Sequence, residues 1–416
     1  MENTCVICHE YFNSKNCAVP IHKSINNKFH FICYNCYFNY ANTKCPYCRE
    51  NIYLIINNNI FIDIYEFCKN STINILPKQK KYLNIDKIID NNTALIWACY
   101  NKLNLIALEL IETRKSIPYH VDNAGNTALI WSCENSLSDV AISLIKTGES
   151  IPYHVNNNGH TALIFACQKS LSDVAILLIK TGESIPYHID NEGNTALIWA
   201  CVNSLINVAI LLINTGKSIP DHVNNAGCTA LLCAINNSLS DVAISLINTG
   251  NSNPSIMTNE AKITALTWAC EKKLSNVALE LIKTGKSMPN HVDRNDYTAL
   301  IYACAYSLPD VAISLIKTGE SLPGYFSKIP DKNNNTALIW ACKKKLSQVA
   351  ITLILTGDSN PNKINFLGET ALKIASKNKL FDVVVLLKKK IIYIYKLLNY
   401  IFLKKLIYFF IFNFKS

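Results

Sequence analysis

The sequence predicts a mainly α-helical solenoid of about nine repeats, preceded by a small metal-stabilised α+β domain. Two observations carry this prediction. Seven of the 17 cysteines lie within the first 48 residues, several of them two residues apart, which is typical of a metal site. The triplet Thr-Ala-Leu recurs at spacings of 34, 34, 34, 34, 35, 34, 38 and 34 residues, a period typical of stacked helical repeats. Its copies begin at Thr93, Thr127, Thr161, Thr195, Thr229, Thr264, Thr298, Thr336 and Thr370.

The N-terminal cysteine pairs have the spacing of zinc ligands. A Cys-x2-Cys pair places two thiolates on one turn, close to the tetrahedral geometry that zinc prefers. A segment of this length cannot build a sufficient apolar core alone, so bound metal would supply folding free energy. The regularly spaced candidates are Cys5, Cys8, His30, Cys33, Cys36, Cys45 and Cys48.

This pattern resembles the RING finger, a family with two interleaved Zn²⁺ ions. The resemblance implies a first ion held by Cys5, Cys8, Cys33 and Cys36, and a second held in part by His30, Cys45 and Cys48. The remaining ligand slot contains Lys28, which cannot bind a metal as an ammonium ion. We expect His22 to replace it, on a hairpin that separates His22 from His30; Cys17 is the alternative.

The same resemblance implies a surface that docks a ubiquitin-charged E2 enzyme. RING domains do no covalent chemistry and only position the E2 thioester. The residues that match the docking positions are Ile7, Tyr40, Pro46 and Arg49, the last by a donor fork suited to bridging two carbonyl groups. Two other interpretations stay open, namely a zinc knuckle that binds nucleic acid and a purely structural cap.

The second copy of the repeat, residues 122–155, predicts two helices and a connector. A first apolar segment follows the Thr-Ala-Leu triplet, and the second segment has Val140, Ala141, Leu144 and Ile145 at helical spacing. We expect Ser138 to cap the second helix and Gly148 to adopt the left-handed conformation just past its end. The Pro-, Asn- and Gly-containing remainder predicts an extended connector.

This copy resembles the ankyrin repeat at Asp122, Gly125, Thr127, Leu129 and Gly148. It departs from the family where Ala128 replaces Pro, where Ile130 replaces His, and in its period. The resemblance covers residues 90–390 and implies a solenoid of helix–turn–helix units. The Asn-, Ile- and Lys-rich composition is also similar to that of ankyrin repeat proteins of giant, mimivirus-like DNA viruses.

Four segments follow from these assignments. Residues 1–52 form the expected zinc finger, and residues 53–89 form a linker that can cap the open end of the array. The repeats occupy residues 90–390, and residues 391–416 form an apolar, basic tail. Uncharged runs in the tail are shorter than the roughly 20 residues of a spanning helix, so membrane binding is not the favoured interpretation. An interfacial membrane helix is one alternative, and a reading-frame slip at Lys388-Lys389-Lys390 is the interpretation we prefer.

Positions that vary between copies predict a partner-binding face. The two residues after the Ala-Cys dipeptide vary, as in Glu134-Asn135 and Lys343-Lys344. The ankyrin resemblance implies that such residues face the concave surface, so we expect a protein substrate there; neutral drift at exposed sites is the alternative. The residue before each triplet varies too, as Asn126, His160, Asn194, Cys228, Ile263, Tyr297, Asn335 and Glu369.

Two recurrent residue types are interpreted as structural. The connector histidines would lie about 10 Å apart in a solenoid, which is too far for a shared ligand shell with Zn–N distances of about 2 Å. We expect the recurrent tryptophans to pack between helices and not to form a base-stacking platform. The histidines are His120, His154, His188, His222 and His291, and the tryptophans are Trp97, Trp131, Trp199, Trp268 and Trp340.

Charge and cysteine usage limit the kinds of partner and the cellular compartment that we expect. The net charge is +10, but seven lysines and no acidic residue follow Asp382. Only three arginines occur, which does not favour base or phosphate recognition. Cysteines inside apolar runs behave as buried hydrophobes, and we see no secretory signal, so we expect the reducing host cytoplasm.

These observations lead to two functional hypotheses. In the first, the chain is an E3 ubiquitin ligase in which the zinc finger recruits the E2 enzyme and the repeats hold the substrate. In the second, the repeats sequester a host factor and the zinc domain is only structural. Nucleic-acid binding through the zinc domain and the basic tail is a weaker third hypothesis. No catalytic triad, phosphate loop or paired carboxylates were found in the sequence.

Overall fold

The computed structural model describes residues 92–112, 114, 116–318, 331–356 and 360–392, and the backbone of two strands near the N-terminus. It divides into two compact units, Met1–Ile185 and Pro186–Ser416. The expected linker and all but the first two residues of the tail lie outside the described residues, as do the following candidate zinc and E2 residues: Cys5, Ile7, Cys8, Cys17, Cys36, Tyr40, Cys45, Pro46, Cys48 and Arg49.

A β-hairpin near the N-terminus confirms one expectation about the zinc segment. Strand β1 (Ala18–Lys23) pairs antiparallel with β2 (Phe29–Cys33). The register places His22 opposite His30, after an irregularity that begins at Pro20. The hairpin expected between the two histidines is therefore present, whereas the role of either one as a zinc ligand stays a prediction.

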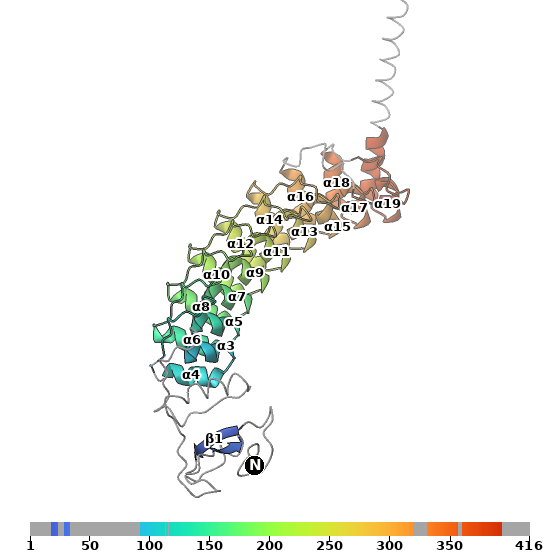
Figure 1. The fold of residues 1–416 in the computed structure, drawn as a ribbon. Coiled ribbons are helices and arrows are strands. Elements are labelled where there is room, and N and C mark those ends of the chain that lie inside the picture. Colours follow the sequence, from blue (N-terminus) through green and yellow to red (C-terminus); the bar gives the residue numbers. More distant parts are fainter. Residues whose placement is uncertain are drawn as a thin grey trace, which may run out of the picture. The chain divides into compact units, whose positions relative to one another are not determined.

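The first unit contains three repeats, each with two short helices. Each repeat has a first helix, a tight turn, a second helix and a loop that leads to the next repeat (Figure 1). The helices, in chain order, are α3 (Ala94–Tyr100), α4 (Asn104–Glu112), α5 (Ala128–Glu134), α6 (Ser138–Thr147), α7 (Ala162–Gln168) and α8 (Ser172–Lys180).

The second unit contains repeats 4 to 9 in the same arrangement. Residues 381–392 are also helical and follow α19 as the second helix of repeat 9. The helices are α9 (Ala196–Val202), α10 (Ile206–Asn214), α11 (Ala230–Asn236), α12 (Ser240–Asn248), α13 (Ala265–Glu271), α14 (Ser275–Lys283), α15 (Ala299–Ala305), α16 (Pro309–Lys317), α17 (Ala337–Lys343), α18 (Ser347–Leu355) and α19 (Ala371–Lys377).

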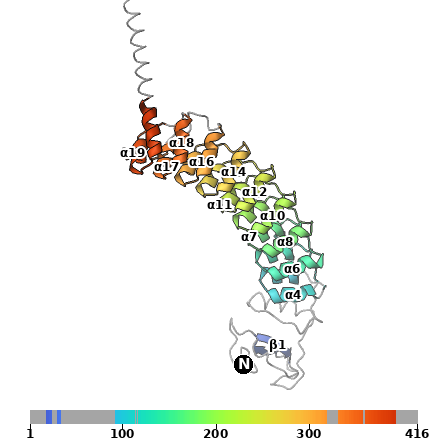
Figure 2. The same ribbon diagram turned by 180° about the vertical axis from the view of Figure 1, so that it is seen from behind.

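Within each unit the helices form two rows. In the second unit, the first helices α9 to α19 contact one another in succession, and the second helices α10 to α18 do the same. Opposite views show the same two rows (Figures 1 and 2). We call them the first-helix row and the second-helix row. The solenoid expected from the 34-residue period is therefore confirmed within each unit.

The threonine of each triplet starts the first helix. In every repeat its hydroxyl oxygen accepts a hydrogen bond from the backbone N–H three residues later, at 3.2–3.3 Å. Such a cap is worth about 1 kcal/mol. The turn after the helix contains a residue with φ between 58 and 62°, which is Ser or Lys in every repeat, for example Ser136 and Lys273.

The second helix starts differently from the expectation for Ser138. Leu137 is the N-cap residue and makes no side-chain cap, while Ser138 is already helical. The backbone N–H of Leu137 instead donates to the carbonyl of Ser132 at 2.8 Å, which closes the turn. The expected left-handed glycine is confirmed, since Gly148 has φ 72° at the C-cap.

The core of each unit lies between its two rows and repeats the same positions. In repeat 2, the predicted stripe of Val140, Ala141, Leu144 and Ile145 is buried, and Cys133 of the first helix is buried beside it. Burying one such aliphatic side chain contributes about 1.5–3 kcal/mol. The cysteines of the apolar runs are therefore part of the core, as expected. No helix in the described residues is long and apolar enough to cross a membrane.

Candidate protein-binding face

A carboxylate at the base of the connector loop fixes the aromatic side chain of the first helix. In repeat 2, the Trp131 indole N–H donates to Asp122 Oδ2 at 2.6 Å. The other Asp122 oxygen accepts the backbone N–H groups of Ala124 and Asn126, which shapes the loop. We call this hydrogen bond between the aromatic side chain and the carboxylate the aromatic lock. It also joins Trp199 to Asp190, Tyr302 to Asp293, and Trp340 to Asp331 at 2.7–2.8 Å.

Repeats with asparagine at this loop position use a different hydrogen bond. Asn156 donates from Nδ2 to Asn126 Oδ1 of the preceding repeat at 2.8 Å. The equivalent pairs are Asn224 with Asn194 and Asn365 with Asn335. The residue nine positions later is then Phe165, Cys233 or Ile374, none of which offers a ring N–H or a hydroxyl. Asparagine therefore links neighbouring repeats where aspartate would lock an aromatic residue.

The connector histidines also link repeats, as their structural interpretation requires. His154 Nε2 lies 2.9 Å from the carbonyl oxygen of Gly125 in the preceding loop. His222 makes the same contact with Gly193 at 2.8 Å, and His291 with Lys262. Because a carbonyl oxygen can only accept, each of these imidazoles carries its proton on Nε2.

The loop tips pack so closely that glycine is required at some of them. A Cβ on Gly125, which has φ 77°, would lie 2.6 Å from Asn157 Oδ1 and 2.7 Å from the Asn157 backbone nitrogen. Lys262 and Asp296, which the sequence places at this glycine position, keep the left-handed conformation with φ 55° and 63°. The loop shape is therefore retained where glycine is absent.

Part of the variable set predicted to face a partner is buried in the stack, which corrects that prediction. Asn126, Asn194 and Asn335 are at most 7% exposed, because each pairs with an asparagine of the next repeat. Asn135 Nδ2 donates to the carbonyls of Cys99 and Tyr100 at 3.1 and 3.2 Å, which caps the preceding first helix. Variation at these positions therefore reflects alternative packing.

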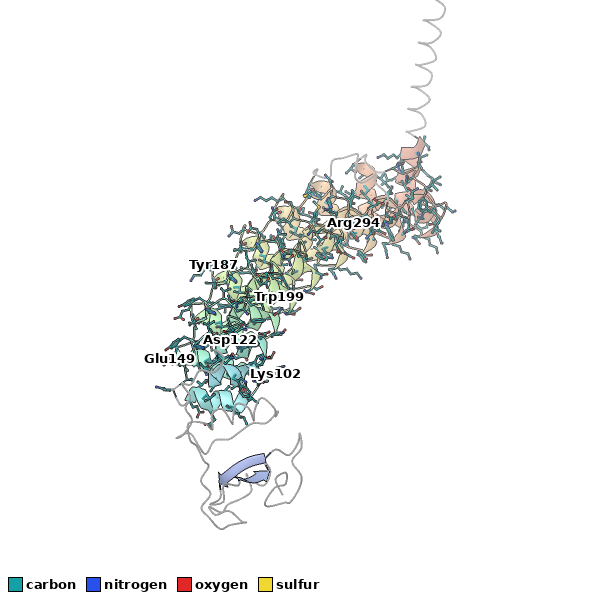
Figure 3. The ribbon with its side chains drawn as sticks, in the orientation of Figure 1. Lys102, Asp122, Glu149, Tyr187, Trp199 and Arg294 are labelled. Carbon is teal, nitrogen blue, oxygen red and sulfur yellow. The ribbon has the colours of Figure 1, made fainter. Side chains whose placement is uncertain are left out.

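The ends of the first helices remain exposed and variable. We define a first-helix end as the last helical residue and the two residues after it. Repeats 4 and 5 have uncharged ends, Val202-Asn203-Ser204 and Asn236-Asn237-Ser238. Repeats 6, 8 and 9 have basic ends instead. In the second unit, Trp199 lies on the side of the first-helix row, and Tyr187 lies on the other side (Figure 3).

A cluster of lysines, which we call the lysine stripe, occupies the ends of α13, α17 and α19. All but Lys343 are exposed, and Lys343 is half-buried. Within the described residues, no ion pair involves any of them. The stripe consists of Lys272, Lys273, Lys343, Lys344, Lys345, Lys377 and Lys379.

Aromatic rings hold part of the lysine stripe in place. The ammonium groups of Lys343 and Lys344 lie 5.3 and 5.8 Å from the centre of the Trp340 ring. Lys273 lies 5.7 Å from the ring centre of Tyr306, which belongs to repeat 7. A cation over an aromatic face is worth about 0.5–1 kcal/mol at an exposed site. These contacts fix several positive charges along the row.

Repeat 5 has two cysteines at positions where repeat 7 has two aromatic rings. Its residues before the triplet and in the fourth helical position are Cys228 and Cys233, whereas repeat 7 has Tyr297 and Tyr302 with ring centres 4.8 Å apart. The Cys233 thiol hydrogen-bonds the Cys228 sulfur and lowers the pKa of Cys228 below its usual value of 9.0. Burial raises the pKa of Cys133 and Cys270 to about 12.

No cluster of metal-ligating side chains occurs in the described part of the chain. The sequence candidates for zinc lie elsewhere, with only the strand backbones of His22, His30 and Cys33 described.

The two-row stack of short helix pairs and connector loops defines a helical-repeat binding scaffold. A family model described as "Ankyrin repeats (3 copies)" matches residues 150–222, 186–256 and 231–323. The ankyrin repeats that the sequence predicted are therefore supported over residues 150–323. Among solved structures, it is similar to the crystal structure of the ankyrin repeat domain of Bcl-3, "a unique member of the IkappaB protein family".

That similarity has 20% sequence identity and a TM-score of 0.41, and it covers 55% of this chain and 99% of the other. No curated protein matches the chain. The matched segments lie within the repeats, so the RING-type zinc finger and the similarity to giant-virus proteins remain predictions.

Proposed function

We propose that the chain is a protein-interaction scaffold that holds a partner protein on its first-helix row. Ankyrin repeats generally bind protein partners. One observation supports this function here: the buried positions recur from repeat to repeat, while the exposed first-helix ends change. Large side chains such as Tyr100, Val202 and Tyr306 are 39–56% exposed at these ends. Within each unit, a stack that displays different side chains at a fixed spacing suits recognition of an extended surface.

We further propose that residues 1–52 form a RING-type zinc finger, so that the chain is an E3 ubiquitin ligase in the host cytoplasm. The support is the ligand spacing in the sequence and the resemblance of Ile7, Tyr40, Pro46 and Arg49 to an E2-docking surface. Pairing of His22 with His30 supports His22 as the irregular ligand. Opposed Cα atoms of antiparallel strands lie about 4.5–5.5 Å apart, a separation suited to two ligands of one ion.

An autoubiquitination assay tests the ligase proposal. The purified full chain is combined with ubiquitin, an E1 enzyme and a panel of E2 enzymes, beside an Arg49→Ala variant. We expect ubiquitin chains with at least one E2 and a strong loss in the variant, because Arg49 would bridge the E2 and ubiquitin. Zinc content provides an independent readout, with two ions per chain expected and one ion per chain contradicting the cross-braced arrangement.

Absence of activity with every E2, despite two bound zinc ions, would favour the alternative function. The repeats would then sequester a host protein without modifying it, and the zinc domain would be structural. The scaffold function itself would survive that result, because it depends on the first-helix row and not on the E2 surface.

A further inference from the structure

The lysine stripe concentrates positive charge on one side of repeats 6 to 9. The first-helix ends of these repeats contain seven lysines and a single acidic residue, Glu271. The second-helix row of the same repeats mixes both signs, as in the ion pair between Lys283 and Glu280 at 2.6 Å. The positive charge is therefore stronger at the first-helix ends than on the second-helix row, where acidic residues offset part of it.

Nearby carboxylates do not neutralise the stripe. Asp293 and Asp331 are 4% and 3% exposed, and each is occupied by the side chain of an aromatic residue and by backbone N–H groups. The side chains of Lys343 and Lys344 extend over Trp340 and do not reach an acid. Seven lysines with one acidic residue among them leave a net positive row. Such a row favours an anionic ligand, because the ligand relieves the mutual repulsion of the lysines.

The position that interlocks repeats elsewhere is released in repeats 6 to 8, whereas Asn378 of repeat 9 still donates to the carbonyl of Cys342 at 2.9 Å. Asn237 Nδ2 donates to the carbonyls of Cys201 and Val202 at 3.1 and 3.2 Å, which ties repeat 5 to repeat 4. The equivalent residues of repeats 6, 7 and 8 are Lys272, Tyr306 and Lys344, and all three are exposed. Repeats 6 to 8 thus display a long side chain where repeat 5 uses asparagine for packing.

Three features favour an acidic protein segment over a nucleic acid. Repeats 6 to 9 contain one arginine, Arg294, whereas base and phosphate recognition depends strongly on the guanidinium fork. Two lysines already lie over the Trp340 ring, and its N–H is bonded to Asp331, so this ring is not open to a stacked base. Tyr302 is buried, with its hydroxyl bonded to Asp293.

We infer that the lysine stripe binds an extended, acidic segment of a partner protein. The inference rests on the proposed scaffold function and names the chemistry of its partner. Stacked helices lie about 8–10 Å apart, and an extended chain advances about 3.3 Å per residue. One repeat therefore corresponds to about three residues, and a segment of roughly ten residues with regularly spaced carboxylates spans repeats 6 to 9.

The test is binding of a fluorescein-labelled oligoglutamate of about ten residues to the full chain, measured by fluorescence anisotropy. One variant combines Lys272→Gln, Lys273→Gln, Lys343→Gln and Lys344→Gln. The control variant combines Lys180→Gln, Lys217→Gln, Lys286→Gln and Lys317→Gln, which lie in or after second helices and change the net charge equally. Circular dichroism melting of both variants verifies that they fold.

We expect saturable binding that weakens with added salt. Four lost attractions of the size of exposed ion pairs correspond to binding at least about fourfold weaker in the stripe variant, with little change in the control. Equal weakening in both variants, or no binding by the unmodified chain, would overturn the inference. Tighter binding of a single-stranded oligonucleotide at the same salt concentration would also overturn it, in favour of a nucleic-acid ligand.

These outcomes are separable from the scaffold proposal. One outcome is that oligoglutamate does not bind while substitution of Tyr100 or Val202 weakens binding of an identified partner. That result would support the scaffold function and contradict binding of an acidic segment. If oligoglutamate binds the lysine stripe and no E2 supports ubiquitination, the inference about the stripe is supported and the ligase proposal is contradicted.

Discussion

Repeats 4 and 5 and repeats 6 to 9 bury the same positions but differ in the charge of their first-helix ends. Leu246 of repeat 5 and Leu281 of repeat 6 are both fully buried at equivalent places in the second helix. Their first-helix ends, however, read Asn236-Asn237-Ser238 and Glu271-Lys272-Lys273. The buried core therefore determines how the repeats stack, whereas the exposed ends of the first helices can differ between repeats and determine which partner binds.

The largest expected effects test whether the two regions share one core. Leu246→Ala and Leu281→Ala each remove a fully buried side chain, and each should lower the free energy of unfolding by about 2–5 kcal/mol. Equilibrium urea denaturation measures both values. Because the surroundings are equivalent, the two costs should agree closely; a cost below about 1 kcal/mol for either leucine would show that its repeat is not part of the continuous core.

The aromatic lock gives the next largest effect. Trp131→Phe removes the indole N–H that Asp122 Oδ2 accepts, so the free energy of unfolding should fall by about 1–3 kcal/mol. Adding Asp122→Asn recreates the Asn156 and Phe165 combination of repeat 3, with Asn92 at the position of Asn126. The double variant should recover part of the loss in a thermal denaturation series. A double variant less stable than Trp131→Phe would contradict the view that the two schemes are interchangeable.

The left-handed turn residues give a smaller, stabilising effect in both regions. Ser238 and Lys273 have φ 59° and 61°, a conformation that costs a residue with a Cβ about 1–2 kcal/mol. Ser238→Gly and Lys273→Gly should each raise the free energy of unfolding by up to about 1 kcal/mol after the entropy of glycine is counted. Ser240→Gly, inside the first turn of α12, is the control and should destabilise; a loss of stability in all three variants would refute the argument.

The smallest effect concerns reactivity and separates repeat 5 from its neighbours. The hydrogen bond from Cys233 lowers the pKa of Cys228, so its reactive thiolate forms at lower pH than that of an ordinary thiol. Among the described cysteines, Cys228 is the one that is not buried. Iodoacetamide applied to the native chain near neutral pH should therefore label Cys228 before the other described cysteines, as read by mass spectrometry. Cys233→Ala, which removes the donor, should slow this labelling, and unchanged labelling would exclude assistance by Cys233.

The sequence predicted the repeats and their core well, because burial follows a fixed period. The 34-residue spacing and the stripe around Val140 and Leu144 were enough to place both helices of each repeat. The side-chain links between repeats were not foreseen, since they join residues about 30 positions apart. A signal was nevertheless present: aspartate at the loop base accompanies Trp or Tyr nine residues later, and asparagine accompanies Phe, Cys or Ile.

The turn and cap chemistry was predicted less well for local reasons. Ser138 was expected to be a cap because Ser commonly caps helices, yet the backbone bond from Leu137 to Ser132 already closes that turn. The left-handed conformation of Ser136 was not predicted from the sequence, because glycine or asparagine is the usual residue in that conformation. The lysine stripe was visible in the sequence only as scattered pairs, and the stacking of α13, α15, α17 and α19 brings those pairs into one row.

Lysine footprinting tests the central claim most directly, because it reads each side chain of the stripe separately. The full chain is acetylated with and without oligoglutamate, and the modification of each lysine is quantified by mass spectrometry. The account predicts protection of Lys272, Lys273 and Lys344, with Lys283 and Lys317 on the second-helix row modified equally in both samples. Equal protection of the two rows, or protection confined to the lysines after Asp382, would contradict the claim that the first-helix ends of repeats 6 to 9 form the binding surface.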